Sequence, residues 1–207
     1  HFRGFESYWE IPANAQTAIH GKWKKGPGKA LFEAFDEALN TGSEGGKLDG
    51  KARIIAEDLG IITTAVTALR QSIGLPGMRI LQFAFDGHSD NLYLPHNFEA
   101  NTVVYTGTHD NDTTCGWWST LAPHDKDYVR RYLGISGETI AWDLIHTASA
   151  SVAALSIIPM QDILELDSMH RMNRPSVPEG SWEWRFNWKQ VRPWHAERLA
   201  DLTRLHG

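Results

Sequence analysis

Acidic side chains suited to acid–base chemistry follow two of the apolar runs in this sequence. Glu57 and Asp58 come directly after a short apolar run, and Asp110 follows the β-rich run 102–106 together with His109. Breaking a glycosidic bond requires one carboxyl group that protonates the leaving oxygen, and a second that stabilises an oxocarbenium-like sugar. Glu57 and Asp110, brought to one edge of a sheet, would suit this chemistry.

Other acids in similar positions have a simpler explanation. Asp86 and Asp162 also follow apolar runs, but an acid at a strand end commonly caps a helix or pairs with an arginine. We therefore expect structural roles for these two side chains. The pair Glu57 and Asp58 differs, because two adjacent acids leaving an apolar strand are electrostatically unfavourable unless something uses them.

The segment 108–114 leaves a metal site open as an alternative. It contains one histidine, two aspartates and an asparagine, and hard oxygen ligands of this kind suit calcium. The EF-hand spacing is absent, since the segment lacks the glycine at the sixth position and the closing glutamate of that loop. We predict a site without a metal.

Four apolar runs are predicted as strands, with helical patterns between them. The strands are expected near residues 53–57, 78–85, 102–106 and 155–160, and the helices near 63–70 and 141–154. Almost continuously apolar strands that alternate with helices predict an α/β fold with a parallel sheet. Acids follow several strands and no glycine-rich phosphate loop follows any, which favours a barrel over an open, doubly wound sheet.

Two segments interrupt the alternation. Residues 40–50 are rich in glycine and polar side chains and are predicted to form a surface loop. Residues 171–185 combine proline, glycine and asparagine with tryptophan and are too aromatic for a linker. An aromatic core would explain many of the nine tryptophans, but Trp182 and Trp184 lie among polar residues, which favours aromatic platforms in a binding cleft.

Charge and cysteine content narrow the class of protein. The formal net charge is −5 and no long basic run occurs, so we expect no nucleic-acid partner. No apolar run approaches the ~20 residues that cross a bilayer.

The single cysteine, Cys115, favours a reducing, cytoplasmic compartment and is predicted to pack rather than react. Because the chain begins with His1, we expect its natural amino terminus to lie upstream.

Five regions, in order and with appropriate gaps from residue 1 to about residue 190, resemble glycoside hydrolase family 77. They read HFRGFESYWEIP (1–12), IAEDLG (55–60), GLPGM (74–78), TGTHDNDTT (106–114), and RMNRP (171–175) with GSWEWR (180–185). The resemblance implies the second half of a (β/α)8 barrel of the α-amylase clan, incomplete in this chain and spanning residues 1–207. It also implies a 4-α-glucanotransferase that acts on maltooligosaccharides and α-1,4-glucans by retaining double displacement, without a cofactor.

The same resemblance implies roles for individual residues. Glu57 resembles the general acid/base, and Asp110 resembles the aspartate that holds the hydroxyls of the distorted sugar. The substrate-binding residues are His109, His1, Asn173 and Asp58. His109 would contact the distorted sugar, whereas His1 and Asn173 would lie on the acceptor side.

The resemblance departs from the family pattern at two places. The nucleophilic aspartate would lie immediately before His1, so we expect it upstream, together with the first half of the barrel. Ser181 stands in a Gly-Ser-Trp sequence where Gly-Asn-Trp is common, which changes one potential sugar contact. An amylase-like α-glucan hydrolase and a catalytically silent glucan-binding fragment stay open as alternatives.

Overall fold

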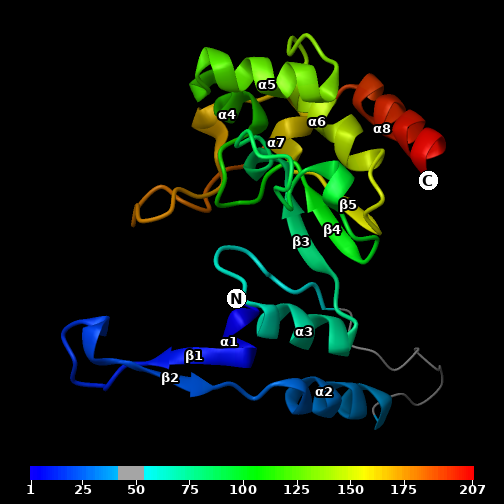
Figure 1. Cartoon of the computed structure of the whole chain (residues 1–207). Coiled ribbons are helices and arrows are strands. Elements are labelled where there is room, and N and C mark those ends of the chain that lie inside the picture. The colour runs from blue at the N-terminus through cyan, green and yellow to red at the C-terminus, as the bar shows by residue number, and fades with distance from the viewer. Residues whose placement is uncertain (42–53) are drawn as a thin grey trace. The chain divides into compact units, whose positions relative to one another are not determined.

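The computed structural model describes residues 1–41 and 54–207, which form two compact units, His1–Met78 and Arg79–Gly207 (Figure 1). The predicted loop over residues 40–50 lies outside the described residues from residue 42 onward. Among the described residues, no helix is long and apolar enough to cross a membrane. Each unit has its own hydrophobic core.

The first unit combines a β-hairpin with helices. Its elements are α1 (Arg3–Glu6), β1 (Ser7–Glu10), η1 (Ala18–His20), β2 (Lys22–Lys25), α2 (Lys29–Thr41) and α3 (Thr64–Ile73). Strands β1 and β2 are antiparallel, with Trp9 opposite Trp23. Helix α3 begins after Thr63, whose side chain accepts a hydrogen bond from the Val66 amide, and ends at Gly74 in the left-handed conformation (φ 79°). The predicted helix and its cap are therefore confirmed.

The second unit contains most of the sheet and is rich in helices. The three-stranded sheet has the order β3 (Gly77–Ile80), β4 (Thr102–Tyr105), β5 (Leu155–Ile157). The helices are η2 (Leu81–Phe83), η3 (Pro95–Asn97), α4 (Thr114–Thr120), α5 (Pro123–Leu133), α6 (Ile140–Ser149), α7 (Met160–Ile163), η4 (Ser168–His170), η5 (Trp188–Gln190) and α8 (Pro193–His206). Strands β4 and β5 are parallel, which supports an α/β fold with a parallel sheet.

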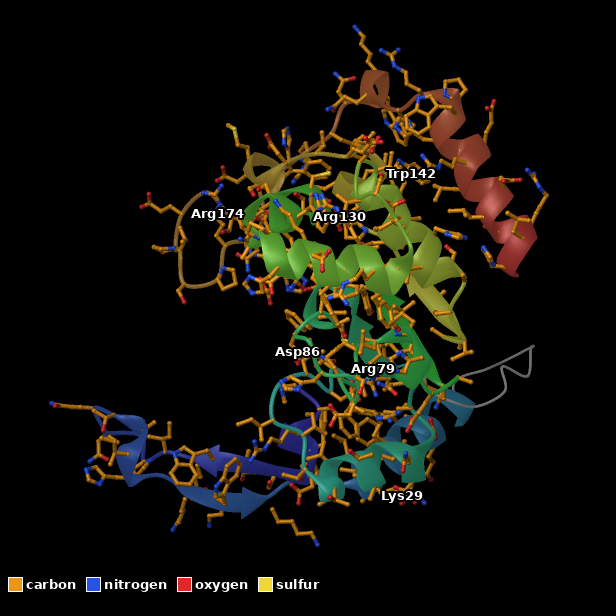
Figure 2. The ribbon with its side chains drawn as sticks, turned by 45° about the horizontal axis from the view of Figure 1, so that its top comes forward. Lys29, Arg79, Asp86, Arg130, Trp142 and Arg174 are labelled. Atoms are coloured by element: carbon orange, nitrogen blue, oxygen red, sulfur yellow. The ribbon has the colours of Figure 1, made fainter. Side chains whose placement is uncertain are left out.

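The core of this unit is aliphatic and aromatic. Its buried residues include Leu81, Leu94, Val104, Val129 and Leu144. Helix α6 also buries Trp142, which Figure 2 shows beside α8, where the Arg198 guanidinium lies 4.4 Å from the Trp142 ring centroid. Part of the tryptophan content therefore serves packing.

Three predicted strands differ from the observed elements. The run 155–160 is a strand only over Leu155–Ile157, since α7 begins at Met160. Residues 54–57 are not assigned to a strand: the Ala56 amide donates to Pro76 O, and Glu57 O accepts from the Phe2 amide. These two bonds go to different segments, so no regular ladder forms. The run 78–85 is a strand only as far as Ile80, because the chain then enters η2.

Candidate functional site

Glu57 lies in an irregular segment that packs against the first residues of the chain. The bond from the Phe2 amide to Glu57 O measures 2.8 Å, and the His1 amino nitrogen lies 3.5 Å from Glu57 Oε2. The ring Nε2 of His1 donates to Leu59 O at 2.7 Å. Two residues predicted from separate motifs, His1 and Glu57, are thus adjacent in the first unit.

Asp58 is held differently from its neighbour. Its Oδ1 accepts from the Met78 amide at 2.7 Å, and its Oδ2 lies 3.3 Å from Nε of Arg70. Both side chains of this ion pair are almost fully buried. A Cβ at position 77 would collide with the Asp58 carboxylate, so Gly77 is needed for this close approach. This geometry indicates a structural anchor, and the substrate-binding role of Asp58 stays a prediction.

Asp110 lies in the loop between β4 and α4 and contacts two other predicted site residues. Its Oδ1 accepts a 2.6 Å hydrogen bond from Nδ2 of Asn173, and its Oδ2 lies 3.4 Å from Nε2 of His109. The loop is stabilised locally, because Asn111 Oδ1 accepts from both the amide and the hydroxyl of Thr108. The second unit therefore brings Asp110, His109 and Asn173 together.

The tryptophan-rich loop 171–185 folds back on itself beside this group and projects from the second unit (Figure 1, orange). The Trp182 amide donates to Met172 O at 2.7 Å, and the Arg174 amide donates to Oγ of Ser181. Figure 2 labels Arg174 on this loop. Trp182 has a positive φ of 68°, which is strained for a bulky residue. Its ring centroid lies 5.0 Å from that of His109.

The six predicted site residues consequently form two groups, one in each compact unit. The first group contains His1, Glu57 and Asp58, and the second contains His109, Asp110 and Asn173. Sequence reasoning did not single out Arg171, which contacts the second group through its guanidinium. Its only sequence signal was its place in the RMNRP motif.

The two acids predicted to be structural have structural contacts. Asp162 is buried and accepts from the Thr114 amide and hydroxyl and from the Thr106 hydroxyl. It thereby links the end of β4 to the first turn of α4, and burial raises its pKa. Asp86 accepts from the His88 amide two residues on, an Asx-type turn.

Cys115 has the environment of a packing residue. It is partly buried against the core of the second unit. Burial, followed by the negative charges of Asp162, Glu165 and Asp167, raises the pKa of its thiol to about 11. A thiol with so high a pKa is a poor nucleophile at neutral pH, because the thiolate is the reactive form.

Two side-chain oxygens of the 108–114 segment accept hydrogen bonds within the protein. Asp112 Oδ2 accepts a 2.6 Å bond from Ser168, and Asn111 Oδ1 is bonded to Thr108. Within residues 1–41 and 54–207, no group of three or more His, Cys, Asp or Glu side chains is arranged to hold a metal. The geometry indicates that this segment is organised by hydrogen bonds among its own side chains.

The fold is α/β, and Asp110 in the loop after β4 lies with His109 beside the ring of Trp182, a combination of polar and aromatic groups typical of carbohydrate sites. The 4-α-glucanotransferase family, glycoside hydrolase family 77, matches residues 1–190. The chain belongs to this family.

Individual relatives agree with this assignment. A chloroplastic/amyloplastic 4-α-glucanotransferase of Arabidopsis thaliana is 49% identical across 100% of this chain and 35% of its own length. The 4-α-glucanotransferase of Thermus thermophilus is 48% identical across 98% of this chain and 40% of its own length. The chain therefore spans about 35–40% of the curated relatives it matches.

Solved structures show the same relationship. An amylomaltase from Streptococcus agalactiae in complex with acarbose superposes with a TM-score of 0.88 at 35% identity, covering 100% of this chain and 40% of that one. Amylomaltase from Corynebacterium glutamicum gives a TM-score of 0.70 at 14% identity, covering 98% of this chain and 34% of that one. The second likeness supports the fold alone.

Proposed function

We propose that this chain is the carboxyl-terminal part of a 4-α-glucanotransferase that moves a segment of an α-1,4-glucan to the 4-hydroxyl of glucose or another glucan. The observation that carries the proposal is the family match over residues 1–190, which includes every motif that holds a proposed site residue. The chain spans a minor share of its relatives. The activity is therefore proposed for the longer protein.

In the proposed reaction, the carboxyl group of Glu57 gives its proton to the glycosidic oxygen as the bond from that oxygen to the anomeric carbon breaks. A carboxylate on the opposite face of the sugar forms the covalent intermediate. The ionised Glu57 then takes the proton from the acceptor's 4-hydroxyl as the acceptor oxygen replaces that carboxylate. Two inversions at the anomeric carbon retain the α configuration.

We propose that the nucleophile is the residue joined to His1. In retaining enzymes the two carboxyl groups lie about 5–5.5 Å apart. The His1 nitrogen, which would be a peptide nitrogen in a longer chain, lies 3.5 Å from Glu57 Oε2. An aspartate attached to that nitrogen could reach a separation of this order. Recovering the coding sequence immediately upstream of His1 tests this directly, and a residue without a carboxylate there would contradict it.

We assign the second group to holding the sugar at the cleavage point. Asp110 and His109 each present an exposed polar side chain, and Asp110 is held by Asn173. We place the chain in the second half of a (β/α)8 barrel, with the acids at the carboxyl ends of its strands. The parallel pairing of β4 and β5 supports this placement.

Incubation of the purified full-length protein with maltotriose tests the proposed activity. Disproportionation should release glucose and produce longer maltooligosaccharides while the total concentration of reducing ends stays constant, since each bond broken is replaced by one formed. A rise in reducing ends that equals the bonds broken would identify the amylase-like hydrolase instead. Absence of any product would contradict both.

A further inference from the structure

The guanidinium of Arg171 contacts the backbone at both residues of the Asp110–Asn173 pair. Its Nη2 donates to Asp110 O at 2.9 Å, and its Nε donates to Asn173 O at 3.2 Å. Its Nη1 lies 4.0 Å from Oδ2 of Asp112, and the Arg171 side chain is 22% exposed. Three nitrogen atoms of one side chain thus face three residues of the proposed sugar-holding region.

These contacts connect Asp110, Asn173 and Arg171 to one another in a closed set of hydrogen bonds. The Asp110 side chain accepts from the Asn173 side chain, while Arg171 holds the main-chain carbonyls of both residues. The two segments are 61 residues apart in the sequence, so their mutual position depends on tertiary contacts. Arg171 fixes the backbone positions from which the Asp110–Asn173 hydrogen bond is made.

Arginine is suited to this arrangement. Its planar guanidinium presents five donors in a fixed fork, so one side chain can hold two carbonyls at a defined separation. A lysine ammonium is a single point on a flexible stem and does not impose that separation. The positive charge of Arg171 also faces the Asp112 carboxylate, and the Ser168 hydroxyl donates to the same Oδ2.

We propose that Arg171 is a positioning residue for the transfer reaction, acting through the Asp110–Asn173 pair. The proposal rests on the proposed function, in which Asp110 contacts the sugar at the cleavage point. Reacting groups must be held within roughly 0.5 Å of their productive geometry, and a displacement of about 1 Å can cost 100-fold in rate. Loss of Arg171 would let the two segments shift by such amounts without removing a group that touches substrate.

The test compares Arg171→Ala and Arg171→Lys in the full-length protein, with maltotriose disproportionation as the assay. We expect kcat to fall about 10- to 100-fold in the alanine variant, with KM changed less than about threefold. The lysine variant should recover only part of the loss. Guanidinium ion added to the alanine variant at concentrations below those that unfold it should restore part of kcat. Arg131→Ala is the matched control, because Arg131 is exposed on α5 and pairs with the exposed Asp127. It should keep wild-type rates.

A double-mutant cycle separates positioning from general support of the fold. If Arg171 acts through the pair, Asn173→Ala combined with Arg171→Ala should reduce kcat little more than the stronger single change. Multiplying effects, a wild-type kcat in both Arg171 variants, or full recovery by lysine would overturn the proposal. If the alanine variant does not fold, the lysine variant, combined with Asn173→Ala, takes its place in the same cycle.

Asp110→Asn distinguishes failure of this inference from failure of the proposed function. An inactive wild-type protein, or an Asp110→Asn variant with unchanged transfer, would contradict the proposed function itself. Loss of activity in Asp110→Asn together with unchanged activity in both Arg171 variants would contradict the role of Arg171 alone.

Discussion

Glu57 and Asp58 are adjacent in the sequence, but their side chains have unequal environments. The Glu57 side chain is 44% exposed and lies beside the His1 nitrogen, whereas the Asp58 side chain is 6% exposed and pairs with Arg70. Asp58 also receives the Met78 amide. Asp58 therefore anchors the segment through buried contacts, and Glu57 stays exposed to solvent.

Glu57→Gln in the full-length protein tests the proposed proton transfer. We expect kcat for maltotriose transfer to fall by roughly 10²–10⁴, since the amide cannot exchange a proton with the glycosidic oxygen. The thermal unfolding midpoint should stay close to wild type, because the replaced side chain is partly exposed. Steady-state kinetics and calorimetry provide the two readings, and near-wild-type turnover would refute the assignment.

Asp58→Ala tests the anchor. Its removal leaves the buried Arg70 charge without this carboxylate, and breaking a buried ion pair typically costs about 3–5 kcal/mol. Urea denaturation should show a loss of this order in the free energy of unfolding. The control Asp127→Ala removes a carboxylate from an exposed pair on α5 and should cost less than about 1 kcal/mol. Equal effects for the two variants would show that burial of Asp58 does not matter.

At the scale of elements, the loop 171–185 places exposed aromatic surface beside the group of His109, Asp110 and Asn173. The strained backbone at Trp182 directs its ring towards His109, and Trp182 is 56% exposed. Strain of this kind costs about 1–3 kcal/mol and persists where the surrounding contacts impose it. The Met172–Trp182 and Arg174–Ser181 bonds supply those contacts.

Trp182→Ala tests the aromatic-platform hypothesis for this loop. A stacking contact with a sugar ring worth about 1–2 kcal/mol would raise KM for maltotriose roughly 5- to 30-fold, and Trp182→Phe should retain part of the affinity. Trp188→Ala is the matched control, since Trp188 lies on η5 and is 76% exposed. Equal KM values in wild type and Trp182→Ala would rule out the platform.

Asp162 joins β4 to α4 through Thr106 and Thr114, and its raised pKa predicts that the stability of the second unit depends on pH. Because burial raises its pKa, the folded protein binds a proton here more readily than the unfolded chain. The stability contributed by this group therefore rises as pH falls from neutrality through the folded pKa, and levels off below the unfolded value of about 3.9.

The asparagine variant Asp162→Asn does not titrate at this position. Its stability cost relative to wild type should accordingly be larger near pH 4 than at pH 7. Urea denaturation of both proteins at the two pH values measures the difference. Asp127→Asn, with its carboxylate exposed, corrects for the general effect of acid. A cost that is equal at both pH values, or larger at pH 7, would show that the pKa of Asp162 is not raised.

At the scale of the whole molecule, the proposed groups are divided between two compact units, and the chain spans 35–40% of its relatives. We expect the 207-residue chain, expressed alone, to show no disproportionation of maltotriose, because the proposed nucleophile and the proposed first half of the barrel would lie outside it. Glucose release by the full-length protein under the same conditions is the control. Measurable transfer by the 207-residue chain would contradict this expectation.

Local patterns in the sequence were sufficient to predict several elements. Apolar runs located β4 and β5, and helical spacing with a threonine cap located α3. The ordered motifs indicated the family, which the match over residues 1–190 confirms. These features depend on residues close together in the chain, so neighbouring residues contain most of the necessary information.

Only the tertiary structure decided which side chain each polar group faces. Asp58 pairs with Arg70 and Met78, and Asp110 is bonded to Asn173 and Arg171, over separations of 12 to 63 residues. Burial and hydrogen-bond geometry arise when distant segments pack, and spacing along the chain does not encode them. The sequence alone therefore indicated a family and candidate acids. The folded chain distinguished an exposed Glu57 from a buried Asp58, and it showed that Arg171 donates to the Asp110 carbonyl.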